Sequence, residues 1–177
     1  MAVIRTIAQM GHPILRQISM CINGFEDPAI RSLGNDLLET AIQSNGVGIA
    51  APQIFESLRM IVIASRPSAR YPHAPELPPV VMVNPELLWA SDERESGWEG
   101  CLSIPGLRGL VPRHLRVGVR YFTIEGEERE SEYEGFPARV FQHEFDHLQG
   151  VLFIDRLESL KELVTEQEYQ RRLTEKQ

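Results

Sequence analysis

The chain has 177 residues, of which 42% are hydrophobic, and its 18 basic and 25 acidic side chains give a formal net charge of -7. This length and composition predict one domain over residues 1–177, and the negative balance argues against broad nucleic-acid binding. The sequence contains no apolar run long enough to span a bilayer and no signal peptide. We therefore expect a cytoplasmic protein, or an organellar one whose transit peptide has been removed.

The first predicted element is a helix. Asp27 and Pro28 are typical of an N-cap and a first turn, and Asn45-Gly46 is typical of a helix end. Small residues then dominate Gly46–Gln53. This stretch lacks the Lys-Ser/Thr pair of a P-loop and the third glycine of a dinucleotide-binding turn. We interpret it as a place where a ligand or another strand lies close against the main chain.

Strands are predicted in the middle of the chain. Arg59–Ala64 contains four consecutive apolar residues, which indicates a strand buried on both faces. Strands are also expected at Val80–Val83 and near Leu87–Ala90. Five prolines indicate that Arg66–Pro79 is a loop, which we expect to border a cleft that Tyr71 can cover.

The second half of the chain is predicted to contain a hairpin and a terminal helix. Alternating apolar residues in Leu115–Tyr121 indicate a half-buried strand, and Glu125-Gly126 turns it back toward Glu127–Tyr133. A charged helix is expected from about Arg156, with a packing stripe formed by Leu157, Leu160, Leu163 and Val164.

The strongest single motif lies between these elements, in a helix that Pro137 opens and Gly150 ends. His143 and His147 are four residues apart, so they lie on one helix face and can bind one metal ion from adjacent turns. Glu144 then lies beside the metal, where a carboxylate can take a proton from bound water. The spacing favours a metal-dependent hydrolase over an accidental pair of surface histidines.

A catalytic site of this type needs a third protein ligand. Phe153 stands where the metzincin pattern has that ligand, and it cannot bind a metal. Glu166 and Glu168 lie in the range used by glutamate-liganded zinc peptidases, although solvated charges are the simpler interpretation. Cys101 offers a thiolate, against the alternative of a buried structural cysteine. The other cysteine, Cys21, is expected to be a buried thiol. Position alone leaves the choice of third ligand open.

Three stretches together resemble the signature motifs of peptide deformylases, in that family's order. They are Gly46-x-Gly48-x-Ala50-Ala51-x-Gln53, Glu99-Gly100-Cys101-Leu102-Ser103 and Gln142-His143-Glu144-x-x-His147, and Arg108 with Val111-Pro112-Arg113 continues the likeness. The proline-rich insert is similar to that of family members with an extended loop at the cleft. Arg139 stands where several relatives have an aliphatic residue, which leaves the shape of the methionine pocket open. We expect an α+β fold, with antiparallel or mixed β-sheets around the central metal-binding helix and with an N-terminal and a C-terminal helix.

The resemblance implies a hydrolase that removes the N-formyl group from the N-terminal methionine of newly made polypeptides and releases formate. It implies that Cys101, His143 and His147 hold a divalent metal. Affinity order favours zinc, whereas the family generally works with Fe(II) and tolerates Zn, Ni or Co as isolated. Glu144 is the implied general base and acid. The Gln53 side chain and the Leu102 backbone N–H are the implied oxyanion donors, and Gly48 is counted among the catalytic residues.

The substrate-binding candidates are the residues expected to line the cleft: Gly46, Val47, Glu99, Gly100, Phe136, Val140 and Tyr71. Val47, Phe136 and Val140 are candidates for the methionine pocket, with core packing as the alternative. The implied partners are N-formylmethionyl peptides, nascent chains and the ribosome, with no membrane. Two other functions remain open: a zinc peptidase with a downstream glutamate ligand, and a catalytically inactive homologue that binds metal or peptide.

Overall fold

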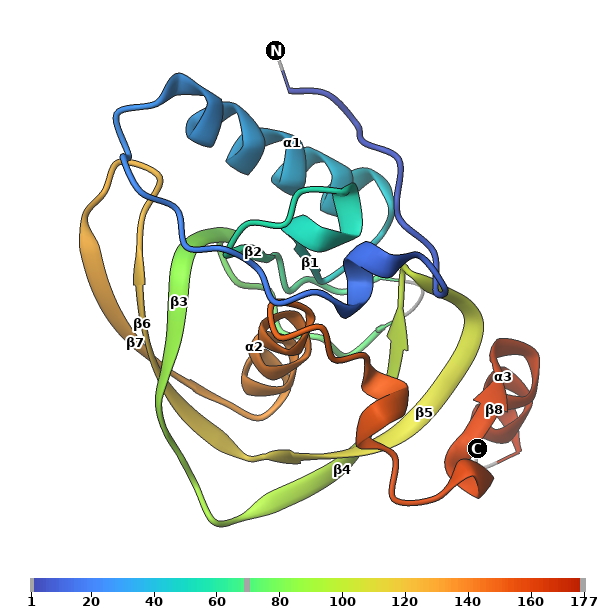
Figure 1. Cartoon of the computed structure of the whole chain (residues 1–177). Coiled ribbons are helices and arrows are strands. Elements are labelled where there is room, and N and C mark those ends of the chain that lie inside the picture. Colours follow the sequence, from blue (N-terminus) through green and yellow to red (C-terminus); the bar gives the residue numbers. More distant parts are fainter. Residues whose placement is uncertain (1, 69–70, 176–177) are drawn as a thin grey trace.

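The computed structural model describes residues 2–68 and 71–175, so residues 69 and 70 of the predicted proline-rich loop lie outside the described residues. Helix α2 (Phe136–His147) lies at the centre of the molecule, surrounded by strands (Figure 1). Two sheets surround it, with strand orders β1-β2-β3-β6-β7 and β4-β5-β8, and all their strand pairs are antiparallel. The expected α+β class is confirmed. No helix among the described residues is long and apolar enough to cross a membrane.

The elements have the following bounds. The larger sheet contains β1 (Gly48–Ala50), β2 (Met60–Ile63), β3 (Val80–Ala90), β6 (Arg116–Phe122) and β7 (Glu128–Glu134), and the smaller contains β4 (Arg94–Cys101), β5 (Ile104–His114) and β8 (Leu163–Thr165). The other helices are α1 (Pro28–Gln43) and α3 (Glu166–Thr174), and short 3-10 helices cover η1 (Pro13–Arg16), η2 (Ala51–Ile54), η3 (Phe153–Arg156) and η4 (Leu160–Glu162).

One bent pair of long strands connects the two sheets. β3 leads into β4 after residues 91–93, and β5 leads into β6 across Leu115. Because β3 pairs with β6 and β4 pairs with β5, the same two ribbons contribute to both sheets (Figure 1). This ribbon pair wraps around α2, and it brings the end of β4 against that helix.

Strand β2 has core on both of its faces, as its four consecutive apolar residues predict. Ile61 and Ile63 pack in the cluster that faces α2. Met60 and Val62 belong to the cluster that α1 covers. The sheet is therefore a layer between α1 and α2, so α2 is buried on its sheet side, and most of its residues are shielded from solvent.

The structure corrects two strand predictions. The separate strands expected at Val80–Val83 and near Leu87–Ala90 are one strand, β3, whose pairing is irregular between Val83 and Glu86. Asn84 there has a φ of 49°, and the following proline has no N–H to donate, so the ladder is interrupted although the strand continues. Strands β4 and β5 were not predicted, because glycines and charged residues interrupt the alternation of apolar and polar residues in their sequences.

The predicted start of the C-terminal helix, at about Arg156, is also wrong. α3 begins at Glu166, where the Thr165 hydroxyl caps it by accepting from the Glu168 N–H at 3.2 Å. The preceding residues form β8, which pairs with β5. Leu160 is 78% exposed and takes no part in the predicted stripe. Pairing with a distant strand therefore overrides a helical spacing that looks sufficient in the sequence.

Candidate active site

One cleft gathers nearly all the residues that the sequence predicted for the site. Its lining contains Gly46, Val47, Gly48, Gln53, Tyr71, Glu99, Gly100, Cys101, Leu102, Phe136, Val140, His143 and Glu144. His147 stands outside this lining and is 1% exposed. Trp98, which had no predicted role there, and Arg139, whose effect on the methionine pocket was left open, complete the wall. The two glycine-flanked motifs and the α2 helix therefore converge in space.

Cys101, His143 and His147 form a compact donor set. Their ligand atoms all lie within 4.8 Å of one another, and the Cys101 Sγ is 3.4 Å from the His147 Nε2. The His143 Nδ1 donates to the Glu99 carboxylate at 2.8 Å, which leaves Nε2 of that ring for a metal. A thiolate and two imidazoles suit a divalent transition metal, so this donor set could hold one, with Cys101 as the third donor. Cys101 is buried and, contrary to expectation, Cys21 is exposed.

The charges of this donor set also fit a cation. Burial raises the pKa of the Cys101 thiol, but the imidazoles of His147 and His143 outweigh it and bring the pKa well below its usual range. The Ser103 N–H donates to the same sulfur at 3.4 Å. Burial lowers the pKa of His143, but Cys101 and Glu99 raise it well above the usual value. A thiolate therefore shares protons with imidazoles here, and a bound cation would replace those protons.

Glu144 is next to this donor set and is 4% exposed. Burial raises its pKa to about 7, although the imidazoles of His143 and His147 act in the opposite direction. Its Oε2 has no hydrogen-bond partner among the described residues. A Cβ at Gly48 would lie 2.6 Å from the Glu144 Oε1, so the carboxylate approaches β1 where that strand has no side chain. A carboxyl group that titrates near neutrality can both accept and return a proton.

Gln53 is held so that its amide faces the metal donors. Its Oε1 accepts from the Ala50 N–H at 2.9 Å, which fixes the side chain. Its Nε2 donates to the Ser103 hydroxyl at 3.1 Å and lies 3.4 Å from the Cys101 sulfur. Ser103 was not among the predicted site residues. Its place two residues after Cys101, inside the second motif, was the signal that could have identified it.

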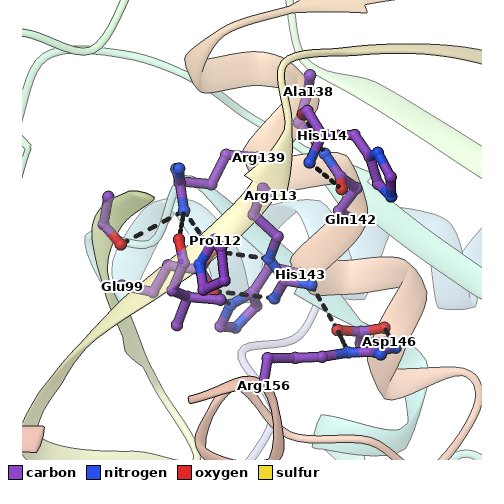
Figure 2. Close-up of polar contacts among 12 residues, drawn as sticks. Glu99, Pro112, Arg113, His114, Ala138, Arg139, Gln142, His143, Asp146 and Arg156 are labelled. Atoms are coloured by element: carbon purple, nitrogen blue, oxygen red, sulfur yellow. Dashed lines mark hydrogen bonds and ion pairs between the residues drawn. The ribbon is translucent and has the colours of Figure 1, made fainter. Parts of the chain in front are cut away.

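Glu99 lines the cleft, but its carboxylate is fully engaged within the protein (Figure 2). Arg113 donates to both oxygens, at 2.9 and 3.0 Å, and Arg139 donates to Oε1 at 3.0 Å. Burial raises the Glu99 pKa, but Arg113 and His143 hold it well below its usual range. The carboxylate therefore holds His143 rather than facing a peptide, which corrects the predicted substrate contact. Arg113 also donates to Asp146 at 2.6 Å, so the network reaches α2 at three residues, Arg139, His143 and Asp146.

The other substrate-binding candidates lie around the mouth of the cleft. Val47 and Val140 are buried in the cluster against α2, and Phe136 is partly buried beside them. The Tyr71 ring centroid lies 5.2 Å from that of Phe136, and the Tyr71 hydroxyl accepts from the Gly100 N–H at 3.3 Å. Tyr71 therefore reaches across the cleft from the proline-rich loop, as expected.

The alternative glutamate ligands lie elsewhere. Glu166 accepts from the Arg108 Nε at 2.6 Å. Glu168 accepts from Arg171 at 2.8 Å and from Arg172 at 3.1 Å on the surface of α3. Neither belongs to the donor set of Cys101. The interpretation as a glutamate-liganded zinc peptidase is therefore wrong.

Comparisons with known proteins agree with this geometry. A family model described as polypeptide deformylase matches residues 4–163. Peptide deformylase 2 of Nostoc sp. is 51% identical over 168 residues, which cover 95% of this chain and 94% of that protein. Peptide deformylase 1 of Prochlorococcus marinus is 47% identical over 155 residues, covering 87% of this chain and 81% of that protein.

Solved structures give the same result. The chain is similar to the class I type b peptide deformylase of Acinetobacter baumannii with Met-Ala-Ser bound, with a TM-score of 0.86 and 46% identity over 89% of this chain and 100% of that one. The peptide deformylase of Thermotoga maritima gives a TM-score of 0.79 and 38% identity over 89% of this chain and 99% of that one. Since the matches cover the fold, all three motifs and the metal donors, this chain belongs to the polypeptide deformylase family.

Proposed function

We propose that this protein hydrolyses the N-formyl group of N-formylmethionyl peptides, and that Glu144 and Gln53 act on it at the Cys101–His143–His147 site. The observation that carries the proposal is the convergence of a near-neutral carboxyl, a fixed amide and three metal donors in one cleft. The Acinetobacter baumannii relative binds Met-Ala-Ser, a peptide that begins with methionine. Removal of the formyl group releases formate and frees the methionine amino group.

Proton transfer is assigned to Glu144. Cys101, His143 and His147 would hold a divalent cation, which would supply Lewis-acid chemistry and lower the pKa of water toward neutrality. Glu144 takes the proton from the attacking water at its carboxylate and gives it to the nitrogen of the departing amine. Its burial beside the metal donors keeps both transfers away from bulk solvent. Gly48 contributes by leaving space for the carboxylate.

Negative charge that develops on the formyl oxygen needs donors already in place. Gln53 offers its Nε2–H group, because its Oε1 is fixed by the Ala50 N–H at 2.9 Å. Leu102 follows Cys101 at the rim of the cleft, and we assign its backbone N–H as the second donor. Loss of one such donor typically costs about 3–4 kcal/mol of transition-state stabilisation.

The peptide backbone is assigned to the edge formed by Gly46–Gly48 and Gly100. Such main-chain pairing tolerates varied sequences after the first residue. The methionine side chain is assigned to the apolar wall of Val47, Phe136 and Val140, with Tyr71 covering it. Glu99 is reassigned from substrate binding to holding His143.

We further propose Fe(II) as the working metal, with zinc, nickel or cobalt as substitutes, because the thiolate–imidazole donor set suits all of them. Metal analysis of anaerobically purified protein tests this, and stoichiometric zinc with full activity would overturn it. The bacterial relatives support a cytoplasmic location and nascent chains as substrates. Ribosome contact, a single domain over residues 1–177 and membership of the extended-loop subset stay predictions.

Formate release from formyl-Met-Ala-Ser by the intact, metal-loaded protein tests the function. We expect turnover by the wild type and its loss in Glu144→Ala with the metal retained. A metal-loaded wild type that binds the peptide without releasing formate would instead support the inactive-homologue alternative. Cys101→Ala is the matched test of the metal site, since it should lose the metal as well as the activity.

A further inference from the structure

The metal-binding helix meets the cysteine-bearing strand at three successive positions. On α2 these positions are four residues apart, and on β4 they are two residues apart. The three contacts are Arg139 Nη1 to Gly97 O at 3.3 Å, His143 Nδ1 to Glu99 Oε2 at 2.8 Å and His147 Nε2 to Cys101 Sγ at 3.4 Å. We call this set the helix–strand ladder, with Arg139–Gly97 as its first rung and His147–Cys101 as its third.

Elementary geometry explains why three rungs can stay in register. Four residues of α-helix advance about 6 Å, and two residues of β-strand advance about 6.6 Å. The spacings are nearly equal, so a contact at one rung fixes the next along both elements. A slip of one residue on the strand would turn Cys101 to the opposite face of β4. The contact between Arg139 and Gly97 therefore influences the distance between the His147 and Cys101 donor atoms.

The first rung is built to resist such a slip. Arg139 is largely buried, and its guanidinium donates to the Glu95 carbonyl at 2.6 Å and to the Val111 carbonyl at 2.7 Å. It also donates to the Glu99 carboxylate at 3.0 Å (Figure 2). It thus connects α2 to β4 and β5 at once. A Cβ at Gly97 would lie 2.7 Å from the Arg139 Cζ, so the guanidinium fills the space that a side chain at position 97 would take.

We propose that Arg139 is a positioning residue for the metal site, which with Gly97 sets the register of α2 against β4 and so holds His143, His147 and Cys101 at metal-binding distance. The proposal rests on the metal site of the proposed function. Without the guanidinium, Glu99 keeps Arg113 but loses its link to the first turn of α2. The helix then has one fewer fixed point on the strand that carries the thiolate.

The test uses Co²⁺ as the probe, with affinity measured by competition against a chelator and geometry followed by visible absorption. Loss of an outer partner of a metal ligand typically weakens metal binding about 10–100-fold. We expect Arg139→Leu to raise the Co²⁺ Kd at least 10-fold and to change the absorption spectrum, and Arg139→Lys to fall between Leu and wild type. Should Arg139→Leu not fold, Arg139→Lys carries the same test, because its single amine cannot reach all the acceptors.

Two controls separate register from general stability. Val83→Ala, in the cluster that α1 covers, should lower urea stability without changing the Co²⁺ Kd or spectrum. Gly97→Ala should weaken Co²⁺ binding in the wild-type background, where its Cβ meets the guanidinium, and weaken it less in Arg139→Leu. The proposal would be overturned if a folded Arg139 variant kept the wild-type Co²⁺ Kd and spectrum. It would also be overturned if the effects of Gly97→Ala and Arg139→Leu on the Co²⁺ Kd were additive. A wild type that binds no Co²⁺ would instead overturn the proposed function.

Discussion

Replacing Gly48 by alanine would add one methyl group where β1 faces the Glu144 carboxylate. The new Cβ would lie 2.6 Å from the Glu144 Oε1 and 2.9 Å from its Cγ, and also 2.9 Å from the Val140 Cγ1. Gly48 is not among the glycines with a positive φ, so alanine suits its backbone and the effect comes from the contact alone. Ordinary van der Waals contact begins at 3.4 Å, so the carboxylate must retreat by about 0.8 Å.

The size of the effect follows from that displacement. Misplacing a reacting group by about 1 Å can cost about 100-fold in rate, equivalent to about 2.7 kcal/mol. We expect kcat for formyl-Met-Ala-Ser to fall about 100-fold while the metal content stays at the wild-type level, because none of the three metal donors is among the nearest contacts of the added methyl. Overpacking should also lower the free energy of unfolding by about 1–3 kcal/mol.

Formate release at saturating peptide, metal analysis and urea unfolding measure these quantities. Gly34→Ala is the matched control, since its Cβ would lie 3.0 Å from the Ile124 Cγ2 and 3.3 Å from the Val81 Cγ1, away from the cleft. It should change stability but not kcat. A folded, metal-loaded Gly48→Ala protein with kcat within threefold of wild type would show that the contact with Glu144 does not limit catalysis.

Five further predictions concern the same site. Glu144→Gln should lower kcat at least about 100-fold with the metal retained, because the proton acceptor is lost; equal activity in the two proteins would remove Glu144 from the mechanism. In the metal-free protein, burial raises the Glu144 pKa to about 7, so the folded state holds this proton more tightly than the unfolded state. The resulting stability should be fully present below about pH 4.5 and be lost as the pH rises through about 7, as urea unfolding at pH 5 and 8 can measure, and Glu144→Gln should abolish this step. Gln53→Ala should lower kcat by about 100- to 1,000-fold with little change in KM, and a change confined to KM would exclude an oxyanion role. Removing the metal with a chelator should lower the unfolding free energy, by about 2.7 kcal/mol relative to protein held at a metal concentration 100 times its Kd, whereas Cys101→Ala should no longer respond to the metal. Tyr71→Ala should raise KM for formylated peptides, because its ring covers the cleft beside Phe136; unchanged substrate and inhibitor kinetics would remove that role.

Local signals predicted the elements that depend on near neighbours. Pro137 stands in the first turn of α2, and Gly150, with a φ of 69°, follows its end, as the sequence indicates. The N-cap of α1 at Asp27 is likewise a local contact, because its carboxylate accepts from the N–H of Ala29, two residues later, at 2.9 Å. By contrast, the helical spacing after Arg156 is misleading, because the segment that follows pairs with β5, which is distant in the sequence.

The residue types of the site can be read from the sequence alone: two histidines one helical turn apart with a carboxyl beside them, and a cysteine within a glycine-flanked motif. The surroundings of each carboxyl, by contrast, depend on how the chain folds. Glu144 is buried next to two imidazoles and titrates near neutrality, whereas Glu99 is held ionised by Arg113, and Glu166 is bound to Arg108 away from the metal donors. The reason is that burial and neighbouring charge set a carboxyl pKa, and both are supplied by segments far apart in the chain.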